Sequence, residues 1–373
     1  MDRAHDDAGT GVAMMRSAMW TGADRLTVEA VSPHDPGPRD VVVRIEASGV
    51  CHSDLNVING HTASRPPMIL GHEGAGVVEW VGSEVSRVKA GARVILSLTP
   101  VCGSCWHCLR QETHLCELGF QLHGLARVVR ADGSSANALL GLGTFSDTAT
   151  VHEASCVPVH TDLPPEQLAL IGCGVTTGLG AALNTAKLAP GATTAVIGCG
   201  GVGMSVIQGA RLAGAATIIA VHPVAMKRDA AVQFGATDTV DPTTGDPREQ
   251  VMALTGGRGV DVAFEVVGAA ELIDQALAMT RRGGTTVLVG LPAHQVQLTT
   301  SAMALVIQDK TIRGSFYGDA RATRDFPRFL QLAERGRLDL ASMVSTRLEL
   351  DDINDAFDAM RAGTVVRSVV VNR

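Results

Sequence analysis

The sequence predicts a fold of the class α/β plus β, in which a doubly wound parallel sheet is inserted into an irregular β-barrel-like domain. Between residues 193 and 317, short apolar runs alternate with helical stretches, a pattern typical of parallel βαβ units. Residues 17–98 instead form short β-rich runs punctuated by glycine, and residues 320–373 return to that style. A length of 373 residues suits two domains.

Composition places the chain among ordinary globular proteins and argues against several functions. The chain is 46% hydrophobic and 18% charged, so it has ample apolar material for a core. A net charge of −7 argues against a nucleic-acid binder that works through phosphate contacts. The start, residues 1–16, lacks the apolar segment of a signal peptide, and no apolar run of about 18 residues suggests a membrane span. Residues 1–15 are expected to form a frayed tail.

The eight cysteines are too few for a disulfide scaffold, and their clustering indicates metal binding in a reducing, cytoplasmic compartment. Four of them follow the spacing C-x2-C-x2-C-x7-C, at Cys102, Cys105, Cys108 and Cys116. Four thiolates complete a tetrahedral shell with no open position, which indicates a structural zinc. An iron–sulfur cluster also uses four cysteines, but usually at other spacings, and four free thiols are a third alternative. His107 lies within this loop and is expected to be solvated, because the cysteines already saturate the metal.

A second set of metal-ligating side chains is spread along the chain. Cys51 and His72 lie in the motifs Cys-His-Ser-Asp and Gly-His-Glu-Gly, and Cys173 follows far downstream. Two thiolates and one imidazole give a catalytic zinc its three protein ligands and leave a fourth position for water or substrate. Because the spacing is not periodic, these residues by themselves could equally be two buried cysteines and a core histidine.

The β-rich segments are expected to carry these ligands on the loops between strands. Apolar and polar residues alternate in 41–45, 75–82 and 91–96, which indicates strands. Residues 117–144, which include His123, are polar and glycine-rich and are interpreted as a loop at the rim of a cleft. Strand signals return at 145–159, and a helix is expected near 164–170, before Cys173.

A glycine-rich turn marks the parallel sheet. The apolar run at 194–197 leads into Gly198-Cys199-Gly200-Gly201-Val202-Gly203 and then into an apolar helix. This is the sequence context of dinucleotide binding, in which glycines let the backbone approach the pyrophosphate at a helix N-terminus. The alternative is a tight strand–helix turn that binds no ligand. Six runs match the strand count of a doubly wound dinucleotide domain; they lie at 194–197, 217–221, 238–240, 260–264, 286–289 and 311–313.

The end of the second of these strands bears on the choice of cofactor. An acidic residue at this position hydrogen-bonds the adenosine ribose of NAD, but this chain has His222, with Lys227 and Arg228 nearby. The change removes a charge that would repel a 2′-phosphate, so NADP(H) stays open as the cofactor. A surface Lys–Arg pair at a helix start is, however, often simply solvated.

Together these motifs resemble those of the zinc-dependent alcohol dehydrogenases of the medium-chain dehydrogenase/reductase family, especially the two-zinc class I/class III type. The resemblance extends from about residue 17 to the end and rests on the histidine motif at 71–73, the four cysteines, the segment 172–178 and the glycine-rich turn. It implies a GroES-like catalytic domain over 1–174 with a zinc lobe at 100–118, a Rossmann domain over 175–317, and a return to the catalytic domain over 318–373. The Cys2His set is the one that alcohol dehydrogenases use for their catalytic zinc.

The resemblance also implies roles for individual residues. Cys51, His72 and Cys173 would hold the catalytic zinc. Asp54 and Glu73 match carboxylates that orient ligand imidazoles or adjust the metal. Ser53 matches the hydroxyl that takes the alcohol proton. The expected cofactor contacts are His52, Thr177, Gly198, Gly200, Gly201, Val202, Gly203, His222, Lys227, Val289, Leu291 and Arg367.

By this resemblance, the chain is expected to transfer hydride reversibly between a primary alcohol or aldehyde and a nicotinamide cofactor, with NAD(H) favoured over NADP(H). Leu98, Phe145 and Phe316 would line an apolar pocket, unless they are core residues. Family proton relays often end on a histidine where this chain has Asn56, which leaves the exit of the proton open. A homodimer or homotetramer is expected, with segments 285–290 and 311–316 as candidate contacts.

Three other functions stay open at this point. A thiol-adduct substrate, as in the formaldehyde-oxidising class, would need an anion-binding residue that the sequence does not identify. A zinc hydrolase or lyase could use the same Cys2His metal but would have no use for the glycine-rich turn. A non-enzymatic dinucleotide-binding protein on this fold could lose zinc ligands, whereas this chain keeps all seven.

Overall fold

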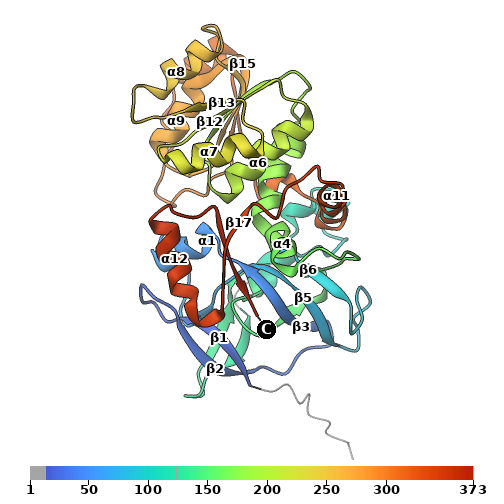
Figure 1. Cartoon of the computed structure of the whole chain (residues 1–373). Helices are drawn as coiled ribbons and strands as arrows, with labels where there is room; N and C mark the ends of the chain where they lie inside the picture. The colour runs from blue at the N-terminus through green and yellow to red at the C-terminus, as the bar shows by residue number, and fades with distance from the viewer. Residues whose placement is uncertain (1–13, 123–124, 373) are drawn as a thin grey trace, which may run out of the picture.

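The computed structural model describes residues 14–122 and 125–372. The strands in these residues form three sheets. Figure 1 shows two stacked parts, a β-rich part formed by both ends of the chain and a parallel α/β part formed by the middle of the sequence. The predicted fold class is confirmed, because the parallel sheet is inserted between strands that belong to one sheet.

The β-rich part contains a closed barrel and a seven-stranded sheet. The barrel follows the order β1 (Met15–Trp20), β2 (Thr27–Pro33), β7 (Ala126–Val129), β8 (Ser135–Ala138) and β4 (Met68–Ile69). The sheet follows the order β10 (Cys156–Pro158), β6 (Arg93–Leu96), β5 (Glu73–Val81), β3 (Asp40–Gly49), β18 (Arg367–Val371) and β17 (Val344–Leu348), with β9 (Thr148–His152) also paired to β3. Since β17 and β18 come from the end of the chain, the C-terminal segment completes the N-terminal sheet.

Two expectations about the β-rich part need correction. Residues 117–144 are not one loop, because they contain α3 (Leu118–Leu122), β7 and β8; His123 lies outside the described residues. The polar stretch is only the hairpin turn, with Gly133 at φ 82°, while Val128 and Ala136 are buried in the barrel. The expected tail also does not extend to residue 15, because Met15 pairs with Val31 in β1; residues 1–13 lie outside the described residues.

Six parallel strands form the sheet of the middle part, the number that the sequence predicts, and their order is β13-β12-β11-β14-β15-β16. Their bounds are β11 (Thr193–Ile197), β12 (Thr217–Val221), β13 (Asp238–Val240), β14 (Val260–Glu265), β15 (Thr280–Leu288) and β16 (Thr311–Gly314). The helices between them are α6 (Gly201–Ala213), α7 (Ala225–Phe234), α8 (Pro247–Leu254), α9 (Ala270–Met279) and α10 (Ala302–Gln308). The strand order reverses between β11 and β14, and in such sheets dinucleotides bind where the order reverses.

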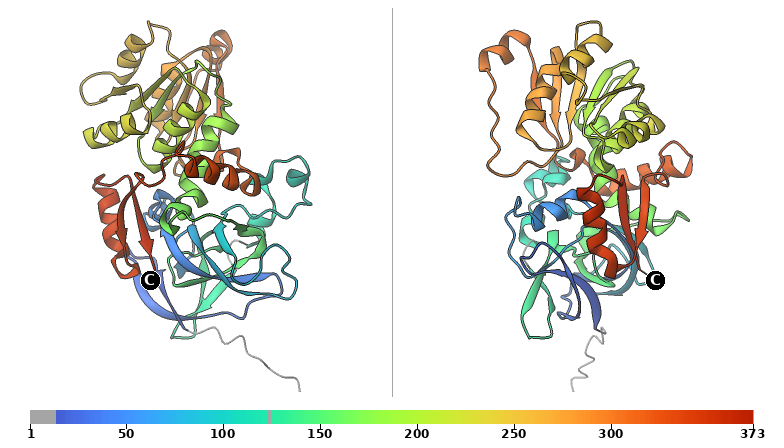
Figure 2. Two further views of the ribbon diagram at one scale, coloured as in Figure 1. Left: turned by 45° about the vertical axis from the view of Figure 1, so that its right-hand side comes forward. Right: turned by 60° about the vertical axis from the view of Figure 1, so that its left-hand side comes forward.

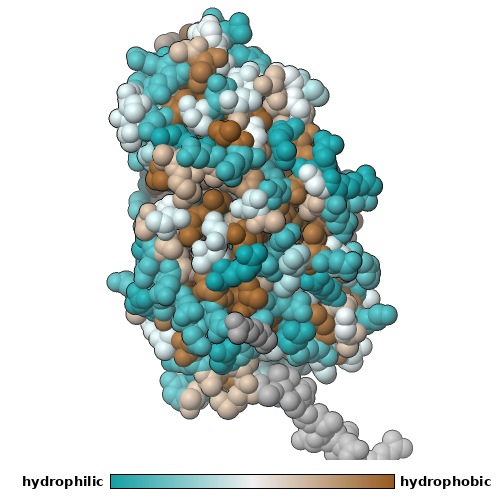
Figure 3. Space-filling model, in the orientation of Figure 1, coloured by the Kyte–Doolittle hydropathy of each residue, from teal (hydrophilic) through white to brown (hydrophobic). Residues whose placement is uncertain are grey.

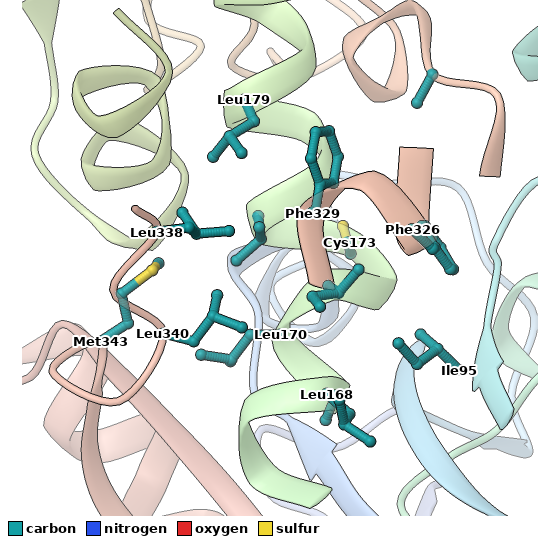
Figure 4. Close-up of a cluster of buried hydrophobic side chains, with 14 of the residues drawn as sticks. Ile95, Leu168, Leu170, Cys173, Leu179, Phe326, Phe329, Leu338, Leu340 and Met343 are labelled. Atoms are coloured by element: carbon teal, nitrogen blue, oxygen red, sulfur yellow. The ribbon is translucent and has the colours of Figure 1, made fainter. Parts of the chain in front are cut away.

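A continuous helical segment, residues 165–185, carries Cys173 through the middle of the molecule. It comprises α4 (Pro165–Leu170), a π-helical stretch (Ile171–Val175), α5 (Thr176–Gly180) and a second π-helical stretch (Ala181–Thr185). Figure 4 shows its leucines and Cys173 in one buried cluster with side chains of α11 (Ala322–Glu334). The segment is long and apolar enough to cross a membrane, which the sequence analysis did not foresee. However, 83% of its apolar 18-residue window is buried in this fold, as in a core helix.

A second core fixes the loop that carries Cys51. Helices α1 (His52–Ile58) and α12 (Ile353–Arg361) contribute Leu55 and Phe357 to it. The ring of Phe357 meets the ring of Phe145 edge to face, with centroids 6.2 Å apart. Because α1 begins directly after Cys51, this packing holds that cysteine against the seven-stranded sheet.

Apolar residues on the face shown in Figure 3 are interspersed with hydrophilic ones.

Candidate metal centres and cofactor site

Three elements bring the widely spaced Cys51, His72 and Cys173 together. Cys51 precedes α1, His72 precedes β5, and Cys173 lies in the π-helical stretch. One ligand atom of each of these residues, together with one of Glu73, lies within 4.8 Å of the others. All four side chains are buried. The pKa of the Cys51 thiol lies well below its ordinary value, mainly because of its hydrogen bond with Cys173. The lowered pKa favours the thiolate form, which is the form that binds metal.

Asp54 fixes the orientation of His72. Its Oδ1 lies 3.1 Å from His72 Nδ1 and accepts from the Gly71 N–H at 2.9 Å, while its Oδ2 accepts from the Cys51 N–H at 3.2 Å. Because the carboxylate oxygen accepts, Nδ1 carries the proton, and in a neutral ring Nε2 then keeps its lone pair. That Nε2 atom is buried and has no hydrogen-bond partner among the described residues. An orphaned imidazole nitrogen beside two thiols fits a zinc ligand set.

Glu73 lies beside the three candidate ligands and is paired with an arginine. Its Oε2 pairs with Arg367 Nη2, and its Oε1 accepts from the Gly174 N–H at 3.1 Å. Burial raises the pKa of Glu73 to about 7, although the positive charge of Arg367 opposes the shift. A side chain at Gly201 would overlap Arg367, so this guanidinium also lies against the glycine-rich turn. Arg367 therefore joins the metal cluster to the turn, while its predicted contact with the pyrophosphate stays a prediction.

The four remaining predicted ligands form the second candidate centre. Cys102, Cys105, Cys108 and Cys116 place one sulfur each within 4.8 Å of the others. They lie around α2 (Trp106–Leu109) and a short 3-10 turn (Thr113–Leu115). We call the segment from Cys102 to Cys116 the four-cysteine lobe. Backbone N–H groups of residues 102, 104 and 105 donate to sulfur at 3.3–3.4 Å, an arrangement that suits thiolates. All eight cysteines of the chain are free thiols, so the four sulfurs fit a closed tetrahedral shell.

The expectation that His107 would be solvated needs correction, because its ring contacts two neighbouring side chains. Its Nδ1 lies 3.2 Å from Glu112 Oε2, and its ring meets Trp106 edge to face. Because the ring nitrogen faces Glu112, His107 is not part of the metal cluster.

The glycines of the turn have separable roles. The turn follows β11, with Gly198 at φ 97°, and α6 begins at Gly201. A Cβ at Gly203 would overlap the carbonyl oxygen of Gly198, so this position needs glycine for strand–helix packing. A Cβ at Gly200, in contrast, would meet nothing within 4 Å. Space beside a bare backbone at a helix N-terminus fits a bound pyrophosphate.

The two glycines give a matched test of the dinucleotide site. Replacing Gly200 by alanine is expected to leave the melting temperature unchanged but to weaken NAD binding by about 1–3 kcal/mol, the usual effect of an added methyl in a close contact. Gly203→Ala is expected to lower the melting temperature, because its methyl meets the chain itself. Calorimetry of NAD binding and thermal unfolding measure the two effects. Unweakened NAD binding by Gly200→Ala would contradict the assignment of this turn to the cofactor.

The cationic residues near His222 are already engaged. Lys227 is only 5% exposed, and its amine donates to the Val365 carbonyl. Arg228 donates to the carbonyl of His222 at 2.6 Å and pairs with Asp241 at 2.8 Å. The pair is therefore not the solvated surface feature considered from the sequence. Burial lowers the pKa of His222, and its Nδ1 accepts from the Val224 N–H at 3.1 Å, so the proton of a neutral ring lies on Nε2.

Glu265 is a buried residue at the switch point that sequence reasoning missed. Its backbone oxygen accepts from the Val289 and Gly290 N–H groups at 2.8 and 3.0 Å. Its carboxylate Oε1 accepts from the Val267 and Gly268 N–H groups at 2.8 and 2.7 Å. One residue thus fixes the loops after β14 and β15, including the predicted contacts Val289 and Leu291. The only sequence signal was an acidic residue that ends an apolar strand.

The remaining predicted residues divide between the site and its surroundings. The hydroxyl of Ser53 lies 3.8 Å from Cys51 Sγ, and that of Thr177 lies 3.9 Å from Cys173 Sγ. His52 is exposed in the first turn of α1. Of the expected pocket residues, Leu98 shares the main core cluster with Cys51 and Cys173, Phe145 is fully enclosed, and Phe316 is 55% exposed. Phe145 is therefore a core residue in this structure.

Comparison with known proteins agrees with this geometry. The family model described as "Zinc-binding dehydrogenase" matches residues 201–335, and "Alcohol dehydrogenase GroES-like domain" matches residues 37–161. An NDMA-dependent alcohol dehydrogenase of Amycolatopsis methanolica is 37% identical over 348 residues, covering 90% of this chain and 93% of that protein. An S-(hydroxymethyl)glutathione dehydrogenase of Synechocystis sp. is 37% identical over 355 residues, covering 92% and 96%. Benzyl alcohol dehydrogenase from Acinetobacter calcoaceticus has a TM-score of 0.90 at 28% identity, with coverage of 97% and 100%.

The chain belongs to the zinc-dependent alcohol dehydrogenases of the medium-chain dehydrogenase/reductase family. It is an oxidoreductase that works on alcohols with a nicotinamide cofactor, as the resemblance implied. The domain matches and the named relatives favour this class of enzyme over the zinc hydrolase or lyase and over the non-enzymatic dinucleotide-binding protein.

Proposed function

We propose that this enzyme interconverts primary alcohols and aldehydes with NAD(H) and holds two zinc ions per chain. Cys51, His72 and Cys173 are the ligands of the catalytic zinc, and the four-cysteine lobe holds the structural one. The observation that carries this proposal is the buried, unpartnered Nε2 of His72, which lies beside two thiols. Three ligands leave the open position that catalysis needs, whereas four close the shell.

The residues around the catalytic ligands have distinct tasks in this proposal. When bound, zinc supplies a Lewis acid and the nicotinamide supplies the hydride acceptor. Ser53, whose hydroxyl lies 3.8 Å from Cys51 Sγ, takes the proton from the alcohol oxygen. Asn56 cannot titrate near neutrality, so water or the cofactor ribose carries that proton outward. With the cofactor bound, Thr177 would contact the nicotinamide, and the loops fixed by Glu265 would receive the carboxamide.

NAD(H) is favoured over NADP(H) because the nearest cations are committed elsewhere. Lys227 and Arg228 donate to backbone carbonyls, and Arg228 also pairs with Asp241. A neutral His222 offers only one donor to a ribose hydroxyl or a 2′-phosphate. The enzyme is therefore expected to discriminate only weakly between NAD(H) and NADP(H), and it should still use NADP(H).

Replacing His222 by aspartate is expected to sharpen the preference for NAD. The carboxylate would accept from the ribose hydroxyls and repel a 2′-phosphate, a change of about 1–3 kcal/mol in favour of NAD. The measurement is the ratio of kcat/KM for NAD and NADP in both proteins. An unchanged ratio, in a wild type that already prefers NAD strongly, would show that this residue does not contact the ribose.

The substrate is the finer part of the proposal. The name of the Acinetobacter neighbour points to an aromatic primary alcohol, and that of the Synechocystis relative to a thiol adduct. The buried, apolar Leu98 shares a cluster with two catalytic ligands, which favours a substrate with an apolar tail. A thiol adduct with an anionic tail needs a cation near the metal, and the buried Arg367 is already paired with Glu73.

A substrate panel tests the proposed function. Ethanol, hexanol, benzyl alcohol and S-(hydroxymethyl)glutathione are assayed with NAD, NADP and NDMA as acceptors, and native mass spectrometry asks whether a cofactor copurifies. The expected result is highest kcat/KM for the apolar primary alcohols with NAD. Turnover restricted to the glutathione adduct would replace this proposal by the thiol-adduct alternative, and no turnover with any alcohol would overturn both.

A homodimer or homotetramer is proposed through the edge of the parallel sheet. β16 is the edge strand, and α10 beside it exposes Met303, Val306 and Ile307 by 71%, 79% and 61%. Val306→Asp is expected to lower the mass measured by light scattering at micromolar concentration. Val232→Asp, at a site 53% exposed on α7, is the control and should leave it unchanged. A monomeric wild type would contradict the proposal.

The domain boundaries and the compartment are also proposals. The catalytic domain spans 1–174 and 318–373, and the Rossmann domain spans 175–317. The continuous helical segment 165–185 crosses the first boundary, so that boundary marks a change of packing partner rather than a break in the chain. Eight free thiols suit a reducing compartment and hence the cytoplasm.

A further inference from the structure

The connection from β16 to α11 is a strained segment in contact with the helix that carries Cys173. Three consecutive residues have left-handed backbone angles, with φ of 54° at Tyr317, 66° at Gly318 and 49° at Asp319. Tyr317 is also buried, at 3% exposure. Non-glycine residues keep such angles only where the surrounding contacts fix them. We call residues 317–321 the strap.

The strap touches the helical segment on both sides of Cys173. The hydroxyl of Tyr317 donates to the carbonyl of Gly172 at 2.5 Å. That carbonyl belongs to the same planar peptide unit as the nitrogen of Cys173, so the phenol fixes the plane from which the metal ligand extends. About two turns further along the helical segment, Gly318 and Gly180 meet backbone to backbone, too close for a side chain on either.

The other end of the strap contacts the four-cysteine lobe. Asp319 Oδ1 lies 3.7 Å from His114 Nε2, and its Oδ2 accepts from Arg313 of β16 at 2.8 Å. Arg321 Nη1 donates to Gln111 Oε1 at 2.6 Å. Gln111 and His114 both lie between Cys108 and Cys116. The left view of Figure 2 shows the lobe, in teal, extending beside the start of α11.

We propose that the strap couples the four-cysteine lobe to the catalytic metal, and that Tyr317 is a positioning residue for Cys173. The inference rests on the proposed function, since it takes Cys51, His72 and Cys173 as the catalytic ligands. It gives the lobe a second role besides stability. Order around the four cysteines fixes Gln111 and His114, these hold the strap, and the strap holds the peptide of Cys173.

Tyr317→Phe in the full-length, zinc-loaded enzyme tests the positioning role. The substitution keeps the buried ring and removes only the hydroxyl. A chelator is expected to withdraw the catalytic zinc roughly 10-fold faster, the size of effect that residues supporting metal ligands have, while the lobe zinc is released at the wild-type rate. In the cobalt-substituted enzyme, the thiolate–cobalt absorption band should shift. Turnover should fall mainly in kcat, with KM for the alcohol little changed.

Arg347→Ala is the matched control. Arg347 pairs with Glu166 of α4 at 3.0 Å, so its removal breaks a contact to the same helical segment without touching the strap. This variant should release zinc at the wild-type rate. If Tyr317→Phe and the wild type released the catalytic zinc at the same rate, and the cobalt band did not shift, the positioning role would be overturned. If instead Cys51→Ala kept two zinc ions, the ligand set of the proposed function would fail, which is a separate outcome.

The coupling to the lobe has its own readout. Tyr317 is the only tyrosine of the chain, so fluorotyrosine incorporated throughout labels the strap alone. Arg321→Ala, which breaks the contact with Gln111, should shift or broaden this single fluorine resonance and should accelerate release of the catalytic zinc. An unchanged resonance and unchanged release in Arg321→Ala would show that the lobe and the catalytic metal are independent.

Discussion

Cys173→Ala is expected to remove one of two zinc ions and to lower turnover at least about 1000-fold, while the chain still folds. The side chain supplies one of three ligands from the middle of a buried helical segment. Losing it leaves two protein ligands and weakens the binding of the metal. The Lewis acidity of such a metal contributes several kcal/mol to the reaction. The cysteine is small, so the helix around it should persist. Metal analysis, circular dichroism and kcat/KM on one preparation measure the three effects.

Cys156→Ala is the control for removing a buried thiol. Cys156 is 3% exposed, and burial raises the pKa of its thiol to about 12, so it is an inert core side chain. This variant should keep two zinc ions and wild-type turnover, with only a small loss of stability. Two zinc ions in Cys173→Ala would contradict the ligand assignment, as would a loss of zinc in Cys156→Ala.

Local signals in the sequence predicted two parts of the candidate site, the four-cysteine cluster and the glycine-rich turn. The four-cysteine spacing and the glycine-rich turn each lie within a few residues, so their geometry is encoded nearly independently of the rest of the fold. Six apolar runs likewise predicted the parallel sheet, because such strands are buried on both faces. The barrel hairpin β7–β8 was missed because it is short and its inward residues, such as Val128 and Ala136, lie among polar ones.

Contacts between distant segments could not be read from the residues alone. The catalytic ligands come from three elements, and only the family resemblance joined Cys51 to Cys173. The pairing of Glu73 with Arg367 spans almost the whole chain, because β18 returns to β3. The roles of Glu265 and Tyr317 depend on which loops meet at the switch point and along the helix. Sequence patterns describe elements well, whereas these roles arise only when the elements pack.

The four-cysteine lobe has little core of its own, so the proposed structural zinc would hold it together. Trp106 and Leu109 are 60% and 73% exposed, whereas Cys108 and Cys116 are buried. A segment this small rarely folds on hydrophobic burial alone, and a structural metal then replaces the missing core. Cys108→Ser is therefore expected to lose the lobe zinc and to lower the free energy of unfolding by about 3–5 kcal/mol, because loss of a metal is among the causes of the largest effects of single substitutions.

Thermal unfolding and limited proteolysis measure this effect, and cleavage should appear first between residues 100 and 118. Ser104→Ala is the matched control, because it removes a hydroxyl 3.7 Å from Cys102 Sγ but no ligand, and it should change stability by less than about 1 kcal/mol. Since the strap connects the lobe to Cys173, the folded fraction of Cys108→Ser should also release its catalytic zinc faster. Wild-type stability in Cys108→Ser, with one zinc lost, would mean that the lobe folds without its metal.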